Sequence, residues 1–136
     1  MESQIGYTPH AVYQINYHFV WIPRYRKTVL QGDIADRLKQ LIYAIAQQYE
    51  FDVLALEVMP DHVHLFVSAP PKYAPAQEVR LFKGITSRRL KQEFEYLRRQ
   101  YWGKNATLWA ESYYVGTAGH VSAETIRKYI EENQRI

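Results

Sequence analysis

Two histidines separated by a single residue form the part of the sequence best suited to chemistry. They lie in the stretch 61–67, Asp-His-Val-His-Leu-Phe-Val, which alternates in the way typical of a β-strand. On a strand, His62 and His64 project to one face and the apolar residue between them projects to the other. Two imidazoles placed in this way can both reach one divalent ion. The spacing therefore predicts a metal site; the alternative is a pair of exposed surface histidines.

A tyrosine near the end of the chain is the candidate nucleophile. Tyr129 lies in a helix predicted from Ser122 to about Asn133, and Asn133 faces the same way one turn later. The two side chains could supply a nucleophile and an amide ligand, or Tyr129 could be a core aromatic, one of 12 tyrosines. The chain contains no cysteine, which excludes thiolate catalysis, disulfides, iron–sulfur clusters and cysteine zinc sites. Any metal site must therefore use histidine, carboxylate or amide ligands.

Positive charge is concentrated in the segment 72–104. This segment has nine Lys or Arg residues and three acidic ones, a net charge of +6, whereas the whole chain carries +3. Bases interleaved with aromatic side chains suit single-stranded nucleic acid, through phosphate contacts and base stacking. A solvated helix face would show the same composition. The predicted DNA-binding residues are cations of this segment and of a smaller cluster near residue 25: Arg24, Arg26, Lys83, Arg88 and Arg89.

Hydrophobic periodicity assigns these residues to a small set of elements. It predicts strands over 12–22, 51–59, 62–69 and 108–115, and helices over 33–49, 76–96 and 122–133. The order β-α-β-β-α-β-α predicts an α+β fold: a ferredoxin-like or RRM-like antiparallel sheet with two helices on one face and an extra C-terminal helix carrying the tyrosine. The first and third strands would be central neighbours. Asn16 and His18 could then lie beside the histidine pair, where they would support the histidines, contact DNA or be ordinary polar residues of the uncovered face.

Length and composition limit the remaining possibilities. The chain has 136 residues, enough for one compact domain over 1–136, and 47% of them are apolar and 23% charged, as in a folded globular protein. No apolar run approaches the ~20 residues of a membrane span. The first residues lack the basic and apolar regions of a signal peptide. We therefore expect a cytoplasmic protein with no membrane partner.

Five stretches of the sequence, taken together and in order, are similar to a known family. The chain resembles the HUH-type single-tyrosine transposases of insertion sequences, the TnpA type, which move as single-stranded DNA. Any one stretch is a weak signal, but together they span roughly residues 12–133. The matching stretches are YHFVWIPRYR (17–26), EVMPDHVHLFV (57–67), FKG with SRRL (82–90), LW, SYYV and TAG (108–119), and ETIRKYIE (124–131).

The resemblance implies an enzyme and gives roles to the residues above. His62 and His64 would bind Mg²⁺ or Mn²⁺, which polarises the scissile phosphate. Tyr129 would attack that phosphate to form a 5′-phosphotyrosine and release a 3′-OH. The family works as a homodimer in which the tyrosine helix of one subunit can complete the histidine site of the other, and it binds DNA hairpins near the ends of the element.

One position departs from the family pattern. The family usually has a glutamine four residues after the tyrosine as a third metal ligand, whereas here Asn133 stands at that position and Gln134 follows it. The predicted third ligand is therefore Asn133 or Gln134. Two other functions stay open: a non-catalytic module that binds single strands or hairpins, and a domesticated, repeat-associated relative of the transposases.

Overall fold

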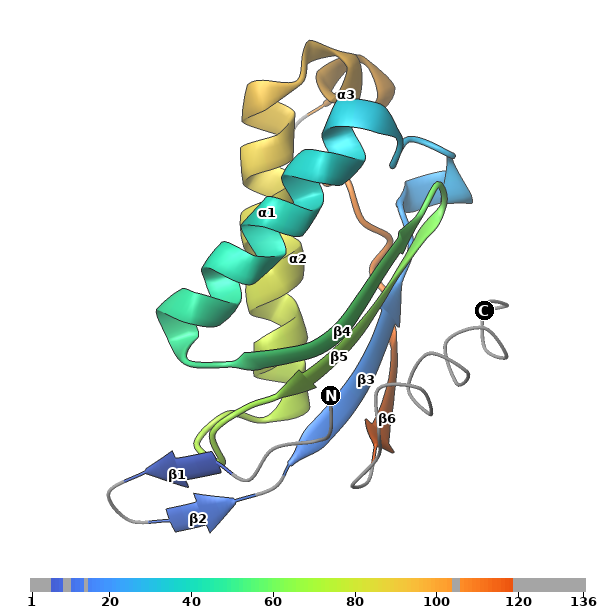
Figure 1. Ribbon diagram of the computed structural model, residues 1–136. Helices are drawn as coiled ribbons and strands as arrows, with labels where there is room; N and C mark the ends of the chain where they lie inside the picture. Colours follow the sequence, from blue (N-terminus) through green and yellow to red (C-terminus); the bar gives the residue numbers. More distant parts are fainter. Residues whose placement is uncertain (1–5, 9–10, 14, 104–105, 119–136) are drawn as a thin grey trace.

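A four-stranded antiparallel sheet packs against two long helices, which cover one of its faces (Figure 1). The computed structural model describes residues 6–8, 11–13, 15–103 and 106–118. The sheet contains β3 (Asn16–Trp21), β4 (Asp52–Met59), β5 (His62–Ser68) and β6 (Tyr114–Ala118), and the long helices are α1 (Gly32–Tyr49) and α2 (Pro75–Glu93). The smaller elements are β1 (Gly6–Thr8), β2 (Ala11–Tyr13), the 3-10 turn η1 (Arg24–Arg26) and α3 (Glu95–Gln100).

The order of the strands in the sheet is β4-β5-β3-β6, and every neighbouring pair is antiparallel. The two central strands are therefore β5 and β3, which are the third and first long strands of the chain. This is the ferredoxin-like arrangement, so the predicted fold class is confirmed. The helix expected over 122–133, with its tyrosine, lies outside the described residues.

The hydrophobic core lies between the sheet and the two long helices. Alternate residues of β3 and β5 point into it, because side chains on a strand alternate between faces. The helices supply apolar stripes at helical spacing, and removal of this surface from water is the main term that stabilises the fold. The core includes Phe19 and Trp21 from β3, Val63, Leu65 and Val67 from β5, Leu38 and Ile42 from α1, and Val79 and Phe82 from α2.

Two elements differ from their predicted bounds. The strand expected over 12–22 is broken, and its first part, β2, pairs with β1 in a separate two-stranded sheet. The basic helix expected over 76–96 ends at Glu93, because Phe94 adopts an extended conformation with φ −122° and ψ 110°, and α3 then begins as a new helix. Phe94 packs against the core, so a tertiary contact accompanies the break.

The fourth strand lies later in the chain than its sequence predicts. The apolar run from Leu108 to Val115 was expected to form it, whereas β6 begins at Tyr114. The start of the run packs on α2 instead: the Trp109 indole Nε1 donates to Thr86 Oγ1 at 2.9 Å, and the Leu108 amide donates to Ser87 Oγ at 3.0 Å. These buried contacts hold the run against the helix until it reaches the sheet edge.

A buried carboxyl stands in the first turn of α2. Glu78 is fully buried, and neither of its carboxyl oxygens has a hydrogen-bond partner among the described residues. Burial raises the pKa of Glu78 to about 8, because an apolar environment disfavours the charged form. The side chain is therefore mostly protonated at neutral pH.

No helix within the described ranges is long and apolar enough to cross a membrane.

Candidate active site

Three imidazoles gather on the face of the sheet opposite α1 and α2. His62 and His64 come from β5, and His18 comes from the neighbouring strand β3. Their exposed fractions are 5%, 0% and 1%. The alternative of exposed surface histidines is therefore wrong, and each ring nitrogen needs a partner or a ligand. Asn16 lies on the same face of β3 and is also buried.

His62 is held by a carboxylate that is itself held by an arginine. The His62 Nδ1–H donates to Asp61 Oδ1 at 2.6 Å, and Arg26 Nε donates to Asp61 Oδ2 at 2.9 Å. Arg26 reaches Asp61 from the η1 turn, where Tyr25 and Arg26 both have left-handed backbone conformations, with φ 63° and 50°. A carboxylate on the second ring nitrogen fixes both the tautomer and the orientation of a ligand histidine.

His64 is held by another histidine. Its Nδ1 lies 3.0 Å from Nε2 of His18. The His18 ring is stacked on Phe66, with centroids 4.3 Å apart, so it is fixed from a second side. A neutral His64 that donates its Nδ1–H to His18 keeps the lone pair of its own Nε2 available. His18 therefore fixes the tautomer and the orientation of His64, as Asp61 fixes those of His62.

The electrostatics keep His18 and His64 neutral and the Asp61 carboxylate charged. Burial lowers the pKa of His18 to about 4, and burial together with the neighbouring imidazoles lowers the pKa of His64 to about 4. Partial burial raises the pKa of Asp61, but the hydrogen bonds and charges of His62 and Arg26 outweigh that effect and hold it below its usual value. A neutral imidazole is the form that can bind a metal ion.

The arrangement leaves one coordinating nitrogen on each histidine of the pair. Nε2 of His62 and Nε2 of His64 are buried, and neither has a hydrogen-bond partner among the described residues. The ring centroids are 5.0 Å apart. Two orphaned imidazole nitrogens with their other nitrogens fixed are a donor set that suits a divalent metal ion. Within the described ranges no group of three or more His, Cys, Asp or Glu residues could complete a metal site.

The remaining ligands and the nucleophile predicted from sequence lie elsewhere in the chain. Tyr129, Asn133 and Gln134 all lie outside the described residues. Their predicted roles therefore stay predictions. Sequence reasoning did not single out Asp61 or its link to Arg26. The signal that could have found Asp61 is its place directly before His62, because carboxylates commonly orient ligand histidines.

The predicted DNA-binding cations have different environments. The Lys83 ammonium donates to the backbone carbonyls of Ala110, Glu111 and Ser112, at 2.6, 3.1 and 3.4 Å. Other cations of the set are engaged by carboxylates: Arg26 by Asp61 at 2.9 Å, and Arg89 by Glu93 at 3.3 Å. Arg88 is exposed, and Arg24 is half-buried. Two of the five, Lys83 and Arg88, line one groove beside α2, and the other three do not.

Comparison with known proteins gives the family. A sequence model described as "Transposase IS200 like" matches residues 11–133. The chain belongs to the IS200-like transposase family. The ISDra2 transposase TnpA of Deinococcus radiodurans is 42% identical over 120 residues, which cover 88% of this chain and 84% of that protein. The transposase for insertion sequence element IS200 of Salmonella typhimurium is 28% identical over 122 residues, which cover 90% of this chain and 78% of that protein.

Solved structures of this kind share the fold. A crystal structure of a transposase from Deinococcus radiodurans superposes with a TM-score of 0.75 at 37% identity, covering 94% of this chain and 97% of that one. A REP-associated tyrosine transposase bound to a REP hairpin superposes with a TM-score of 0.60 at 16% identity, covering 94% of this chain and 69% of that one. The family resemblance seen in the sequence is confirmed.

Proposed function

We propose that this IS200-like transposase cleaves and rejoins single-stranded DNA at insertion-sequence ends, with a divalent metal ion and a 5′-phosphotyrosine intermediate. The observation that carries the proposal is the pair of buried Nε2 atoms on His62 and His64, each on a ring fixed through Nδ1. Family membership supports the same reading, because transposases act on DNA ends.

The metal site would be built on the histidine pair. His62 and His64 would supply two nitrogens, and Asn133 or Gln134 would supply an amide oxygen. Mg²⁺ or Mn²⁺ bound there would polarise the scissile phosphate and orient it for in-line attack. The protein's own contribution is to bury both imidazoles and to fix their orientation through the Asp61 and His18 contacts.

Tyr129 would be the nucleophile. Its phenol oxygen would form a bond to the scissile phosphorus while the bond to the 3′ oxygen breaks. The phenol loses its proton, and the leaving oxygen takes one up to become a 3′-OH. The ester linkage is conserved in the phosphotyrosine, so a 3′-OH can attack it later and rejoin strands without an external energy source. An unperturbed phenol has a pKa of about 10, so the phenol of the nucleophile must be activated.

The DNA partner would be a single strand with hairpins at the element ends. One structural neighbour is described as bound to a REP hairpin, which is a reason to propose a hairpin here. The concentration of positive charge in the segment 72–104 supports the same partner, because cations that neutralise phosphates release counterions.

We also propose a homodimer. β6 is an edge strand that pairs with β3 on one side, and within the described chain it has no strand on the other. Three side chains at this edge are partly exposed: Tyr113, Tyr114 and Val115. An exposed, apolar edge is a surface that proteins usually cover. In such a dimer the tyrosine of one subunit could act at the histidines of the other.

The decisive experiment is to look for the covalent intermediate. Wild-type protein is incubated with labelled single-stranded element ends and Mg²⁺, and a protein–DNA adduct that survives SDS is the expected product. The Tyr129→Phe variant should bind the same DNA with equal affinity and form no adduct. If wild type binds but forms no adduct, the chain is a binding module instead of a nuclease. An adduct that persists in the Phe variant would show that another residue is the nucleophile.

A mixing experiment tests the shared site. Tyr129→Phe and His64→Ala are each inactive alone under the proposal. If the site is shared between subunits, their heterodimer contains one intact site and recovers partial cleavage. If the site lies within one subunit, nothing is recovered even when subunit exchange is confirmed by a tagged pull-down.

A further inference from the structure

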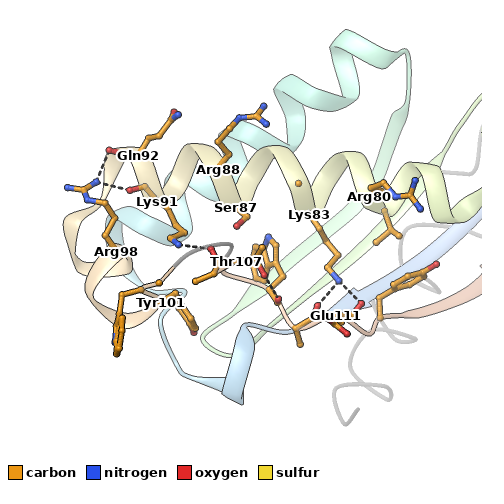
Figure 2. Close-up of a pocket in the computed structure, with 18 of the residues that line it drawn as sticks. Arg80, Lys83, Ser87, Arg88, Lys91, Gln92, Arg98, Tyr101, Thr107 and Glu111 are labelled. Carbon is orange, nitrogen blue, oxygen red and sulfur yellow. Dashed lines mark hydrogen bonds between the residues drawn. The ribbon is translucent and has the colours of Figure 1, made fainter.

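A groove lies between α2 and the segments 101–103 and 106–113, on the helical layer (Figure 2). Its volume is about 1120 Å³. One wall is α2, and the other wall is held to it by two lysines: Lys83 donates to Ala110 O at 2.6 Å, and Lys91 donates to Ala106 O at 2.7 Å. The two walls are therefore tied together along the groove.

A glycine in the middle of α2 lines this groove without a structural reason to be glycine. Gly32 and Gly103 have positive φ angles of 58° and 108°, and a Cβ at Gly116 would collide with the Tyr114 hydroxyl. At Gly84 the backbone is helical, and a Cβ would meet nothing within 4 Å. Glycine weakens a helix interior relative to alanine. The fold gains nothing from this choice, and close approach of a ligand to the helix would explain it.

Arginines flank the glycine by one turn on each side. Arg80 and Arg88 are four residues before and after Gly84, so they share its face of the helix, about 6 Å away along the axis. Both line the groove and are exposed. Within the described part of the chain neither guanidinium forms an ion pair or hydrogen bond, in contrast to Arg89, which pairs with Glu93 at 3.3 Å. Two cations therefore bracket a bare stretch of helix surface.

The charge and aromatic content of the groove match a nucleic-acid strand. Five of its lining residues are Lys or Arg, and one, Glu111, is acidic. Trp102 and Tyr113 also line it, and they are 81% and 37% exposed. Exposed aromatic rings beside a basic channel are the features on which bases of a single strand stack. An apolar peptide would leave the arginines unpaired, so a polyanion fits better.

We propose that a DNA strand runs along this groove, with its sugar–phosphate backbone passing over Gly84 between Arg80 and Arg88 and with a base stacked on Trp102. The proposal rests on the proposed DNA substrate and adds the place and the mode of contact. Gly84 is the position where the backbone of the strand comes nearest to the backbone of the protein. A side chain there would fill the space that the strand needs.

The test uses substitutions at Gly84 of increasing size. Binding of a fluorescein-labelled single-stranded oligonucleotide is measured by anisotropy, and folding is measured by thermal unfolding. Gly84→Ala should raise the Tm, because alanine favours the helix, and yet weaken DNA binding. Gly84→Leu should weaken binding at least about 10-fold without lowering the Tm. Ala44→Leu, at an exposed site on α1 outside the groove, is the matched control and should bind as wild type.

Salt dependence gives an independent readout. Arg88→Ala should reduce the slope of log affinity against log salt by about 0.7 for a single phosphate lost, whereas Lys39→Ala, at an exposed position of α1 outside the groove, should leave it nearly unchanged. The proposal is overturned if Gly84→Leu binds the oligonucleotide as tightly as wild type. That result would leave the transposase chemistry standing if wild type still forms the SDS-stable adduct. A wild type that binds no single-stranded DNA would overturn both.

Discussion

On the two central strands, the two faces of the sheet are equally buried and differ in chemistry. On β3 and β5, Phe19 and Leu65 face the helices with exposed fractions of 0%, while His18 and His64 face the other way with 1% and 0%. Burial of the apolar residues stabilises the fold, whereas burial of an imidazole disfavours its charged form and requires partners for its nitrogens. One face therefore provides stability, and the other disfavours the charged form of His18 and His64.

The largest expected effect separates chemistry from folding on β5. His64→Ala should reduce metal-dependent DNA cleavage by more than about 100-fold, because a proposed metal ligand is lost and removal of even a ligand's support costs 10–100-fold. Binding of Mn²⁺, measured by calorimetry, should fall in parallel. Far-UV circular dichroism should show a folded protein. Cleavage at the wild-type rate with metal present would contradict the assignment.

Substitution of Leu65, the residue next to His64, should reduce stability and leave the chemistry intact. Leu65→Ala removes a fully buried side chain from the core, and we expect it to lower the free energy of unfolding by about 2–5 kcal/mol. Urea unfolding monitored by tryptophan fluorescence measures this. At low temperature, the fraction that remains folded should cleave DNA at close to the wild-type rate. A large loss of activity per folded molecule would mean that the two faces are not independent.

The histidine face should also make stability depend on pH. The pKa values of His18 and His64 are lowered from 6.5 to about 4, so the unfolded chain binds more protons than the folded one between these values. Their contribution to the free energy of unfolding is fully present above pH 6.5 and is lost as the pH falls toward 4. The loss is at most about 3 kcal/mol per imidazole. Urea unfolding from pH 4 to pH 7 checks this. A His18→Phe, His64→Leu variant should lose that part of the dependence.

A smaller effect is expected from the carboxylate behind His62. Asp61→Asn keeps the size of the side chain but removes the charge that orients the His62 Nδ1–H, so Mn²⁺ affinity should fall by about 10–100-fold. The free energy of unfolding should change far less than in Leu65→Ala. Asp36→Asn, at an exposed position of α1, is the control for loss of a carboxylate outside the site. Unchanged Mn²⁺ affinity in Asp61→Asn would remove Asp61 from the site.

Local patterns predicted most of this fold. The period-2 alternation of β5 assigned Val63, Leu65 and Val67 to the core, and helical spacing located α1 to within one residue of its start. The position of β6 could not be predicted, because it depends on contacts between Trp109 and Thr86, 23 residues apart. A run of apolar residues does not reveal whether it will pack on a helix or pair in a sheet.

The candidate site was also predictable only where it depends on local spacing and not on contacts between distant segments. That His62 and His64 share a face follows from their spacing alone. The bond between His64 and His18 depends on the register of two strands whose residues are 46 positions apart, and the sequence left it as one of several alternatives. Charge alone could not separate Arg88, which is exposed, from Lys83, whose ammonium is bound by carbonyl oxygens.

The buried carboxyl of Glu78 takes up a proton when the chain folds, whereas the buried histidines release protons. Its pKa is raised from 4.5 to about 8, so at pH 7 folding takes up a proton at this residue. That contribution is fully present below pH 4.5 and is lost as the pH rises through 8. Between pH 4.5 and 6.5 the histidines release protons on folding while Glu78 gains one. The two effects oppose each other there, so this carboxyl partly flattens the acid side of the stability curve and steepens the decline toward alkaline pH.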